Sequence, residues 1–310
     1  MSSTDALPPP PGYDPALTVS MRQADEGGGV RAPAVAAGRT PSLPRRELLV
    51  LLHGFNNHLR EAEYAYGAFR DGQDTRLPPT TWGGIEAGLA DSFWPGDAHG
   101  PGVLDKLDFL VYPVAVGRAQ ESGAALAQYI AGRSEVLQVH FVAHSLGCRV
   151  ALETLRALQD LRAPVRIGRV CLMAAAVTTQ QVGPGGRLRD ALLTARELRV
   201  LYSPDDTVLH YAFPPGQTAA GAGEGFFPEA VGRHGSVPGA PAALESLPVP
   251  GADHSDYWGV PQFVTHPTAA ATAQSLLAAF IGRDGLGRDL AGRADPAPRG
   301  LNERTLDTRA

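Results

Sequence analysis

Short apolar runs recur along the middle of the chain, and stretches with helical spacing of their apolar residues separate them. The runs are continuous rather than alternating with polar residues, which is typical of strands buried on both faces. We expect strands at residues 48–52, 88–94, 139–143, 167–175 and 198–203, with a weaker one at 246–250. We expect helices at residues 58–70, 118–132, 146–161, 186–195 and 266–282. This alternation predicts the α/β class, with a mostly parallel central sheet and helices on both of its faces.

Both ends of the chain and one internal segment fit this alternation less well. Residues 1–46 are rich in Pro, Gly, Ala and Ser, and we expect a poorly ordered arm there. Residues 283–310 are polar and predict a flexible tail. Residues 107–112 are compatible with a strand or with a helix that Pro113 interrupts. The remaining residues, 47–282, have the size of a single α/β domain.

Composition narrows the partners of this domain. Of the 310 residues, 44% are hydrophobic, which is enough for a large buried core. The net charge is −5, and acids and bases are interspersed without a basic stripe, so nucleic acid is not an expected partner. No stretch approaches the roughly 20 apolar residues of a membrane span, and the first residues lack the features of a secretory signal. We therefore expect a cytoplasmic protein that acts on a small molecule; the oligomeric state is not indicated.

Ser145 is the strongest candidate for chemistry. It follows the strand expected at residues 139–143, and an expected helix follows it in turn. The small residues Ala143 and Gly147 lie two positions to either side. This is the pattern of a nucleophile elbow, a sharp strand-to-helix turn that exposes a serine hydroxyl and tolerates only small neighbours. The alternative is a serine in an ordinary buried turn, so the rest of the chain must supply the other groups that the chemistry needs.

A serine hydroxyl needs a base, and the base needs an orienting acid. In enzymes with a nucleophile elbow these follow in the order serine, acid, histidine. The strand expected at residues 198–203 ends in Pro204-Asp205-Asp206, and we prefer Asp206 over Asp205 as the acid. His254 lies in a loop after the last strand and before the last helix, where the base is expected. His266 is the rival, although its place at the start of the last helix suggests a capping role.

Acyl transfer also needs hydrogen-bond donors for the developing oxyanion. One is expected to be the backbone N–H of Leu146, directly after the nucleophile. The loop after the first apolar strand suits the second donor, the N–H of Phe55, because Gly54 lets this loop turn back over the serine. The Asn56 side chain can hold the loop through bonds to the backbone. We expect His53 to be structural rather than catalytic.

Four motifs in this order resemble the α/β-hydrolase superfamily, over about residues 47–282. The chain looks closest to a group of largely uncharacterised bacterial hydrolases. The motifs are His53-Gly54-Phe55-Asn56-Asn57, Phe93-Trp94-Pro95, Ala143-His144-Ser145-Leu146-Gly147 and Ser203-Pro204-Asp205-Asp206. The resemblance implies an α/β-hydrolase fold, a Ser145–Asp206–His254 triad, and no metal or organic cofactor. One departure is the segment 173–176, which lacks an acid that such relatives often carry there.

These residues predict a serine hydrolase that cleaves carboxylic esters through an acyl-enzyme. An acyltransferase or thioesterase would use the same groups, and a binding module that has lost the chemistry is a third alternative. The span 176–198 is too short for a large cap domain, so we expect a light cover from residues 207–245, with Phe226 and Phe227 as further candidate walls. The substrate-pocket candidates are Asn56, His144, Trp94, Phe213 and Trp258. For Trp82, Trp94 and Trp258 the alternative is packing in the core.

Overall fold

The computed structural model describes residues 8, 10–25, 28–37, 46–97, 108–221, 223–240 and 244–283. They contain an eight-stranded sheet with the order β2-β1-β4-β3-β5-β6-β7-β8. The strands are β1 (Leu17–Arg22), β2 (Val30–Ala37), β3 (Glu47–Leu52), β4 (Leu89–Phe93), β5 (Gln138–His144), β6 (Arg166–Met173), β7 (Glu197–Tyr202) and β8 (Leu244–Pro248). Only the β1–β2 pair at one edge is antiparallel; the neighbours from β1 to β8 pair in parallel. The predicted α/β class and mostly parallel sheet are confirmed.

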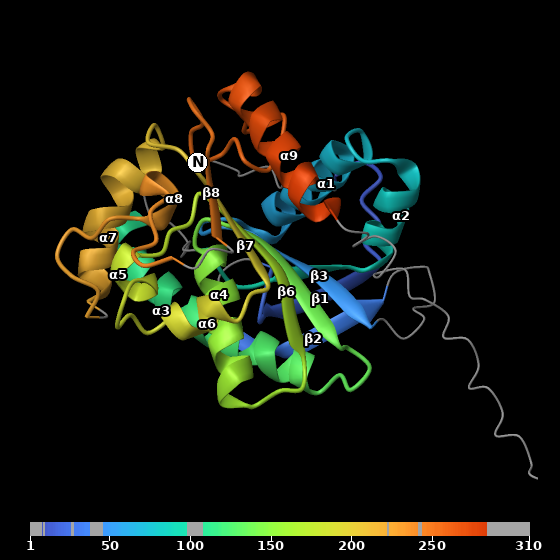
Figure 1. The fold of residues 1–310 in the computed structure, drawn as a ribbon, viewed down its shortest axis with the longest axis horizontal. Coiled ribbons are helices and arrows are strands. Elements are labelled where there is room, and N and C mark those ends of the chain that lie inside the picture. The colour runs from blue at the N-terminus through green and yellow to red at the C-terminus, as the bar shows by residue number, and fades with distance from the viewer. Residues whose placement is uncertain are drawn as a thin grey trace, which may run out of the picture.

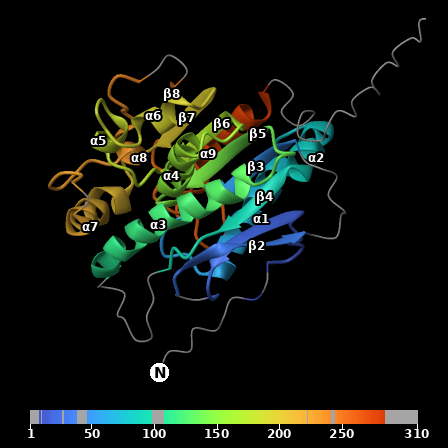
Figure 2. The same cartoon turned by 90° about the horizontal axis from the view of Figure 1, so that it is seen from below.

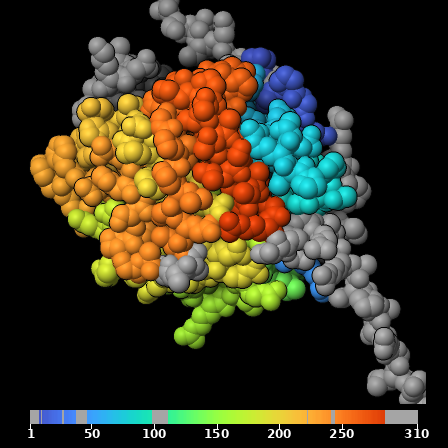
Figure 3. All heavy atoms as spheres, turned by 45° about the horizontal axis from the view of Figure 1, so that its top comes forward, coloured from blue at the N-terminus to red at the C-terminus, as the bar shows by residue number. Residues whose placement is uncertain are grey.

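Helices cover both faces of this sheet (Figure 1). On one face, α3 (Asp108–Ala131) packs along α4 (Gly147–Asp160), and both lie in front of the strands in Figure 2. On the other face lie α1 (Leu59–Asp74) and α9 (Pro267–Ile281), with α2 (Pro79–Ala87) beside α1. The short helices are α5 (Thr179–Val182), α6 (Arg189–Leu193), α7 (Phe213–Ala220) and α8 (Val231–His234), with a π-helical turn, η2 (Val208–Ala212). Figure 3 shows α9 in red beside the α1–α2 region in cyan.

The sheet core explains why the apolar runs are continuous. All five residues of β4 are buried, as are all residues of β3 and β5 except the first of each. Burial on both faces leaves no position for the polar half of an alternating pattern. The six strands expected from these runs, and the helices at residues 58–70, 118–132, 146–161, 186–195 and 266–282, are present with shifted ends.

The N-terminal segment differs from the expected poorly ordered arm. Residues 17–22 and 30–37, within the expected arm 1–46, form β1 and β2, and β1 joins the sheet beside β4. The signal is an alternation: Leu17, Val19 and Met21 are buried, whereas the residues between them are half-exposed. This period-two pattern is typical of a strand with one exposed face. The high content of Pro, Gly, Ala and Ser in residues 1–46 led instead to the expectation of a poorly ordered arm.

Other boundaries also differ from the sequence expectations. Residues 108–112 begin the long helix α3, which runs through Pro113 rather than ending there. Helix α2 has no counterpart among the predicted elements, since Gly83 and Gly84 interrupt its apolar spacing. Of the expected tail, residues 284–310 lie outside the part of the chain that the structure describes. No described helix is long and apolar enough to cross a bilayer.

The order of the strands places the candidate residues together. The chain runs from β3 to β4 on one side and then crosses to β5 on the other side of β3. This reversal opens a crevice at the carboxyl ends of β3 and β5, which is where open α/β sheets bind ligands. Gly54 follows β3, and Ser145 follows β5. The sheet topology therefore brings the candidate oxyanion loop against the candidate nucleophile.

Candidate active site

Ser145 lies on a strained turn between β5 and α4. Its φ is +54°, in the left-handed region that non-glycine residues rarely adopt. A Cβ on Gly147 would collide with the backbone carbonyl oxygen of His53, and one on Gly54 would lie 3.0 Å from the Ser145 Cβ. The Ser145 N–H donates to the carbonyl of Met173 at 3.0 Å, which anchors the turn to β6. These contacts explain why the motif carries small residues around the serine.

The side chains of Ser145, His254 and Asp206 form one hydrogen-bonded chain. His254 Nε2 lies 2.7 Å from Ser145 Oγ, and His254 Nδ1 lies 2.8 Å from Asp206 Oδ2. The other oxygen of Asp206 accepts the backbone N–H of Leu209 at 2.8 Å, and the carboxylate is fully buried. Nδ1–H therefore donates to the carboxylate, which leaves Nε2 free to accept a proton from the serine. Side chains from three distant parts of the chain can thus act as nucleophile, base and orienting acid.

The two rival residues have structural partners instead. Asp205 accepts the N–H of Gly251 at 2.8 Å, which ties the turn after β7 to the loop that carries His254. His266 lies 3.1 Å from a carboxylate oxygen of Asp256 at the start of α9. The structure therefore brings Asp206 and His254 to Ser145, and it keeps Asp205 and His266 out of that chain of bonds.

Two further acids organise the loop that carries His254, and sequence reasoning did not single them out. Asp253 accepts the N–H groups of His254 and Thr207, and Asp256 accepts the N–H of Asp253. Partial burial raises the pKa of each carboxyl, but these hydrogen bonds outweigh that effect and hold both pKa values below their usual range. Both acids are therefore ionised at neutral pH. The two aspartates in Asp-His-Ser-Asp were the available signal in the sequence, because aspartate side chains in loops often accept hydrogen bonds from nearby backbone N–H groups.

The candidate oxyanion donors lie in the expected loops. Within the described residues, no hydrogen-bond acceptor is paired with the backbone N–H of Phe55 or of Leu146. The next residue, Asn56, has a φ of +59°, and its N–H donates to Gly96 at 2.8 Å. Asn56 therefore holds its loop through the backbone. The two unpaired N–H groups are available to a charge that develops on a bound substrate.

A buried ion pair supports this loop from behind. Arg22, at the end of β1, lies 2.6 Å from Asp97 and also donates to the carbonyl of Trp94 at 3.0 Å. Both charged side chains are almost completely buried. The segment after β4, which binds the Asn56 N–H, is thus fixed by the N-terminal hairpin. Nothing in the local sequence pairs Arg22 with Asp97, because they are brought together only by the pairing of β1 with β4.

His53 is structural, as expected. Its ring is fully buried and stacks on Trp94 at a centroid distance of 5.6 Å. Nδ1 lies 2.9 Å from the Gly54 carbonyl, and Nε2 accepts the backbone N–H of Trp94 at 3.3 Å. These two bonds fit one neutral tautomer, with the hydrogen on Nδ1.

His144 holds the base through its main chain. Its Nε2 lies 2.8 Å from the carbonyl oxygen of His254, so Nε2 carries the hydrogen, and the two rings are 5.0 Å apart. Burial, and then the charge of His254, lowers the pKa of His144 to about 3. His144 therefore remains neutral at physiological pH.

Three buried histidines make the fold sensitive to acid, which gives a testable prediction. Burial lowers the pKa of His53 to about 3, as it does for His144, and burial also lowers the pKa of His140. In the unfolded chain the value is about 6.5, so below that pH the unfolded state binds more protons. Above about pH 6.5 the three histidines cost no unfolding free energy. As the pH drops from there towards 3, protonation of the unfolded chain lowers the unfolding free energy progressively. We expect His53 and His144 each to remove about 2 kcal/mol from the unfolding free energy at pH 5.

Urea unfolding curves measured between pH 7.5 and 5 test this expectation. A His144→Asn variant should reduce the pH slope of the unfolding free energy by about 1.4 kcal/mol per pH unit, because one buried histidine is gone. His210, which is exposed, supplies the control, since His210→Gln should leave the slope unchanged. An unfolding free energy that is constant from pH 7.5 to 5 would contradict the prediction.

A cavity of about 350 Å³ opens beside His254. Three of the five predicted pocket residues, Asn56, His144 and Trp258, line it together with Phe55. Trp94 and Phe213 do not, and these two expectations are corrected. Trp94 is fully buried and its indole N–H donates to the His53 carbonyl at 2.8 Å, whereas Phe213 packs against Tyr112 in the core.

Two other sets of aromatic residues also lie away from this cavity. Trp82 packs on Phe69 with a centroid distance of 6.1 Å and is 4% exposed, so core packing explains it. Phe226 and Phe227 pack on each other and are largely exposed. Neither set lines the cavity beside His254.

The segment between β7 and β8 is attached to the nucleophile helix rather than forming a separate cap. Arg149 of α4 lies 2.7 Å from Glu224, and both side chains are buried. The same carboxylate accepts hydrogen bonds from Thr178 at 3.3 Å and Gln217 at 2.9 Å. The described part of this segment is η2, α7, α8 and their connections, which agrees with a fold that lacks a large cap domain.

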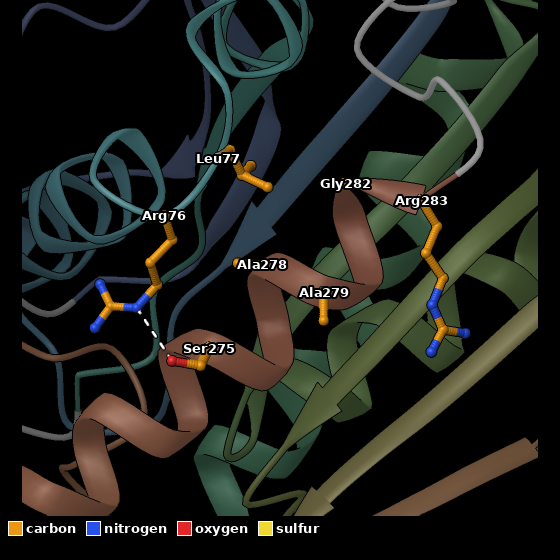
Figure 4. A pocket seen from close by; sticks show the side chains of 7 residues that line it. All are labelled: Arg76, Leu77, Ser275, Ala278, Ala279, Gly282 and Arg283. Carbon is orange, nitrogen blue, oxygen red and sulfur yellow. Dashed lines mark hydrogen bonds between the residues drawn. The ribbon is translucent and has the colours of Figure 1, made fainter.

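A second hollow, of about 410 Å³, lies between α9 and the turn after α1 (Figure 4). Arg76 reaches across it to Ser275 at 3.4 Å, and Arg283 points away from α9. None of the residues singled out from the sequence lines this hollow. In the described part of the chain, no group of histidine, cysteine and carboxylate side chains is arranged to hold a metal ion.

A comparison with known protein families agrees with this architecture. A family model described as "Alpha/beta hydrolase of unknown function (DUF900)" matches residues 36–213, more than half of the chain. The esterase domain of a Rhodothermus marinus protein is 15% identical, with 86% of this chain and 91% of that chain covered and a TM-score of 0.36. Carboxyl esterase 2 (TmelEST2) from the mycorrhizal fungus Tuber melanosporum is 12% identical, with 93% and 90% covered and a TM-score of 0.44. No curated protein sequence matches the chain.

Proposed function

The chain belongs to the α/β-hydrolase family of unknown function (DUF900), and from this premise we propose that it cleaves carboxylic esters through a Ser145 acyl-enzyme. The observation that carries the proposal is the chain of short contacts between Ser145, His254 and Asp206, at 2.7 and 2.8 Å. A serine that is merely part of a turn has no need of an oriented imidazole. The unpaired N–H groups of Phe55 and Leu146 support acyl transfer in particular.

In the first half of the proposed reaction, Ser145 Oγ attacks the ester carbonyl carbon while His254 Nε2 takes the hydroxyl proton. Asp206 holds the tautomer that permits this transfer and stabilises the imidazolium that results. The carbonyl oxygen becomes an oxyanion and accepts hydrogen bonds from the N–H groups of Phe55 and Leu146. When the tetrahedral intermediate collapses, the bond to the alcohol oxygen breaks and Nε2 donates the proton to that oxygen.

In the second half, water repeats the sequence on the acyl-enzyme. His254 takes a proton from the water, the hydroxide attacks the acyl carbon, and the bond to Ser145 Oγ breaks as Nε2 returns the proton to the serine. The carboxylic acid product then leaves. The left-handed backbone at Ser145 holds Oγ at the carboxyl end of the sheet, facing His254 Nε2, through both halves.

A fluorophosphonate probe and a series of p-nitrophenyl esters of increasing acyl length test the proposal together. We expect the probe to add covalently to Ser145, located by mass spectrometry of the labelled peptide, and short esters to release p-nitrophenolate. Absence of both labelling and hydrolysis would favour a binding module that has lost the chemistry. Products measured with added alcohols and thiols separate ester hydrolysis from an acyltransferase, and acyl thioesters tested in the same series reveal a thioesterase.

A further inference from the structure

The cavity beside His254 lies on the side of the leaving group in the proposed reaction. His254 Nε2 must reach the alcohol oxygen in order to protonate it, so the alcohol part of an ester lies on the histidine side of the scissile bond. The cavity is bounded by His254, by His144, and by the loop that follows the histidine as far as Phe263. Helix α1 closes its other side with Glu61 and Ala65. Of the two candidate oxyanion donors, Phe55 lines the cavity, whereas Leu146 and the nucleophile Ser145 do not.

The wall of this cavity combines apolar side chains with the polar residues Asn56, Asn57 and Ser255. Phe55, Trp258 and Phe263 line it, with aliphatic contributions from Ala65 and Val260. A volume of about 350 Å³ is at the small end of ligand sites and suits a group of one ring. Aromatic faces carry negative potential, so they attract a desolvated cation as well as apolar surface.

The charged groups around the cavity favour a positive ligand. Among the described residues that line it, Glu61 is the single acidic side chain and no arginine or lysine is present. One Glu61 oxygen accepts the His58 N–H at 2.8 Å and caps α1, and among the described residues the other oxygen accepts no hydrogen bond. His144 is neutral, and in the proposed reaction His254 carries a positive charge only between its two proton transfers, with Asp206 beside it. The nearest arginine along the helix, Arg60, is paired with Glu63. The ionised Asp253 and Asp256 flank the lining residues His254 and Ser255, and Asp256 is bonded to His266.

We propose that this cavity is the alcohol-binding site of the ester hydrolase and that it selects compact, ring-sized alcohols that carry a positive charge. This proposal rests on the proposed function. The cation would lie against the aromatic walls, with the Glu61 carboxylate as its counter-charge. Anionic alcohols of the same shape would be excluded, since they would face Glu61 without a basic partner.

Three acetate esters that share a meta-substituted six-membered ring test the charge preference: 3-methylbenzyl acetate, (1-methylpyridinium-3-yl)methyl acetate and 3-carboxybenzyl acetate. The measured quantity is the ratio of kcat/KM for the cationic ester to that for the neutral one. Comparing this ratio between protein variants cancels the intrinsic reactivity of the esters. Dividing each kcat/KM by the rate constant for hydroxide hydrolysis of the same ester corrects the wild-type values for reactivity. The corrected values should favour the cationic ester over the anionic one by at least tenfold at low salt, and less so at high ionic strength.

The decisive variant is Glu61→Gln. Glutamine keeps an acceptor for the His58 N–H and so preserves the capping box, while the charge is lost. We expect the cation-to-neutral ratio to fall by about fivefold, the upper end of what one solvent-exposed ion pair contributes. Phe263→Leu should lower the same ratio by about two- to threefold by removing an aromatic face.

Asp71→Asn is the matched control. It removes an exposed acidic charge ten residues further along α1, outside the cavity lining, and should leave all three kcat/KM values unchanged. An unchanged ratio in Glu61→Gln, or a wild type that prefers the anionic ester, overturns the alcohol-site proposal while ester hydrolysis itself still stands.

A binding measurement separates this proposal from the catalytic one. Calorimetry on Ser145→Ala protein measures how tightly the cavity binds free alcohols in the absence of turnover. The two alcohols are 1-methyl-3-(hydroxymethyl)pyridinium and 3-methylbenzyl alcohol. Tighter binding of the cation, lost in Ser145→Ala/Glu61→Gln, supports the site even if no ester is cleaved. Equal or weaker binding of the cation overturns it.

Discussion

Replacing Ser145 with alanine is expected to reduce kcat for p-nitrophenyl ester hydrolysis by about 10³-fold or more. The variant keeps the oxyanion N–H groups and the cavity, but no oxygen remains to form the acyl-enzyme. Residual activity would come only from water attacking a substrate that is held by these groups. Steady-state kinetics with an excess of a short-chain ester measures the loss, and the fluorophosphonate adduct should disappear with it.

Stability must be separated from chemistry in this experiment. Alanine has the same backbone restriction as serine at a φ of +54°, so the melting temperature should change little. Ser275→Ala is the matched control, because Ser275 is an exposed serine on α9 that lines the second hollow and is not near His254. Wild-type turnover in Ser145→Ala, or a comparable loss in Ser275→Ala, would show that the chemistry takes place elsewhere.

Asp206→Asn is expected to lower kcat by about 10⁴-fold with little change in KM, by comparison with the same substitution in other triads. The Leu209 N–H donates to Oδ1 at 2.8 Å, so the asparagine oxygen must stay there and its NH₂ group must face His254 Nδ1. That arrangement puts the imidazole hydrogen on Nε2. The base then has no lone pair for the Ser145 proton.

The neighbouring acid supplies the comparison for this substitution. Asp205→Asn retains an oxygen that can accept the Gly251 N–H, so activity should stay within a few-fold of the wild type. The kinetics of both variants, measured on one ester at one pH, decide between the two acids. A large loss in Asp205→Asn with an active Asp206→Asn would reverse the assignment of the orienting acid.

Local sequence patterns were sufficient for most of the fold. Continuous apolar runs identify strands such as β3 and β5, because a strand buried on both faces has no exposed position to mark with a polar residue. The elbow around Ser145 was equally readable, since the backbone of a sharp turn restricts the size of the residues two positions away. These features depend only on residues that are close in the chain.

The tertiary structure alone decided which distant groups meet. Two adjacent aspartates follow β7, and only the placement of the His254 loop brings Asp206 rather than Asp205 to the imidazole. Similarly, whether an aromatic residue lines a pocket depends on its neighbours across the fold. Trp94 was expected in the pocket, but in the structure it is buried and stacks on His53.

The sequence by itself therefore determined the α/β class, the positions of the main strands along the chain and the elbow, because short-range sterics and strand burial depend on residues that are adjacent in the chain. The N-terminal hairpin, the Arg22–Asp97 pair and the cavity walls were decided by the tertiary structure. Their partners are separated by tens of residues or more, and no local pattern states which segments will pack together. The charge selectivity proposed for the alcohol site belongs to this second class, because Glu61 and Phe263 meet only in the folded chain.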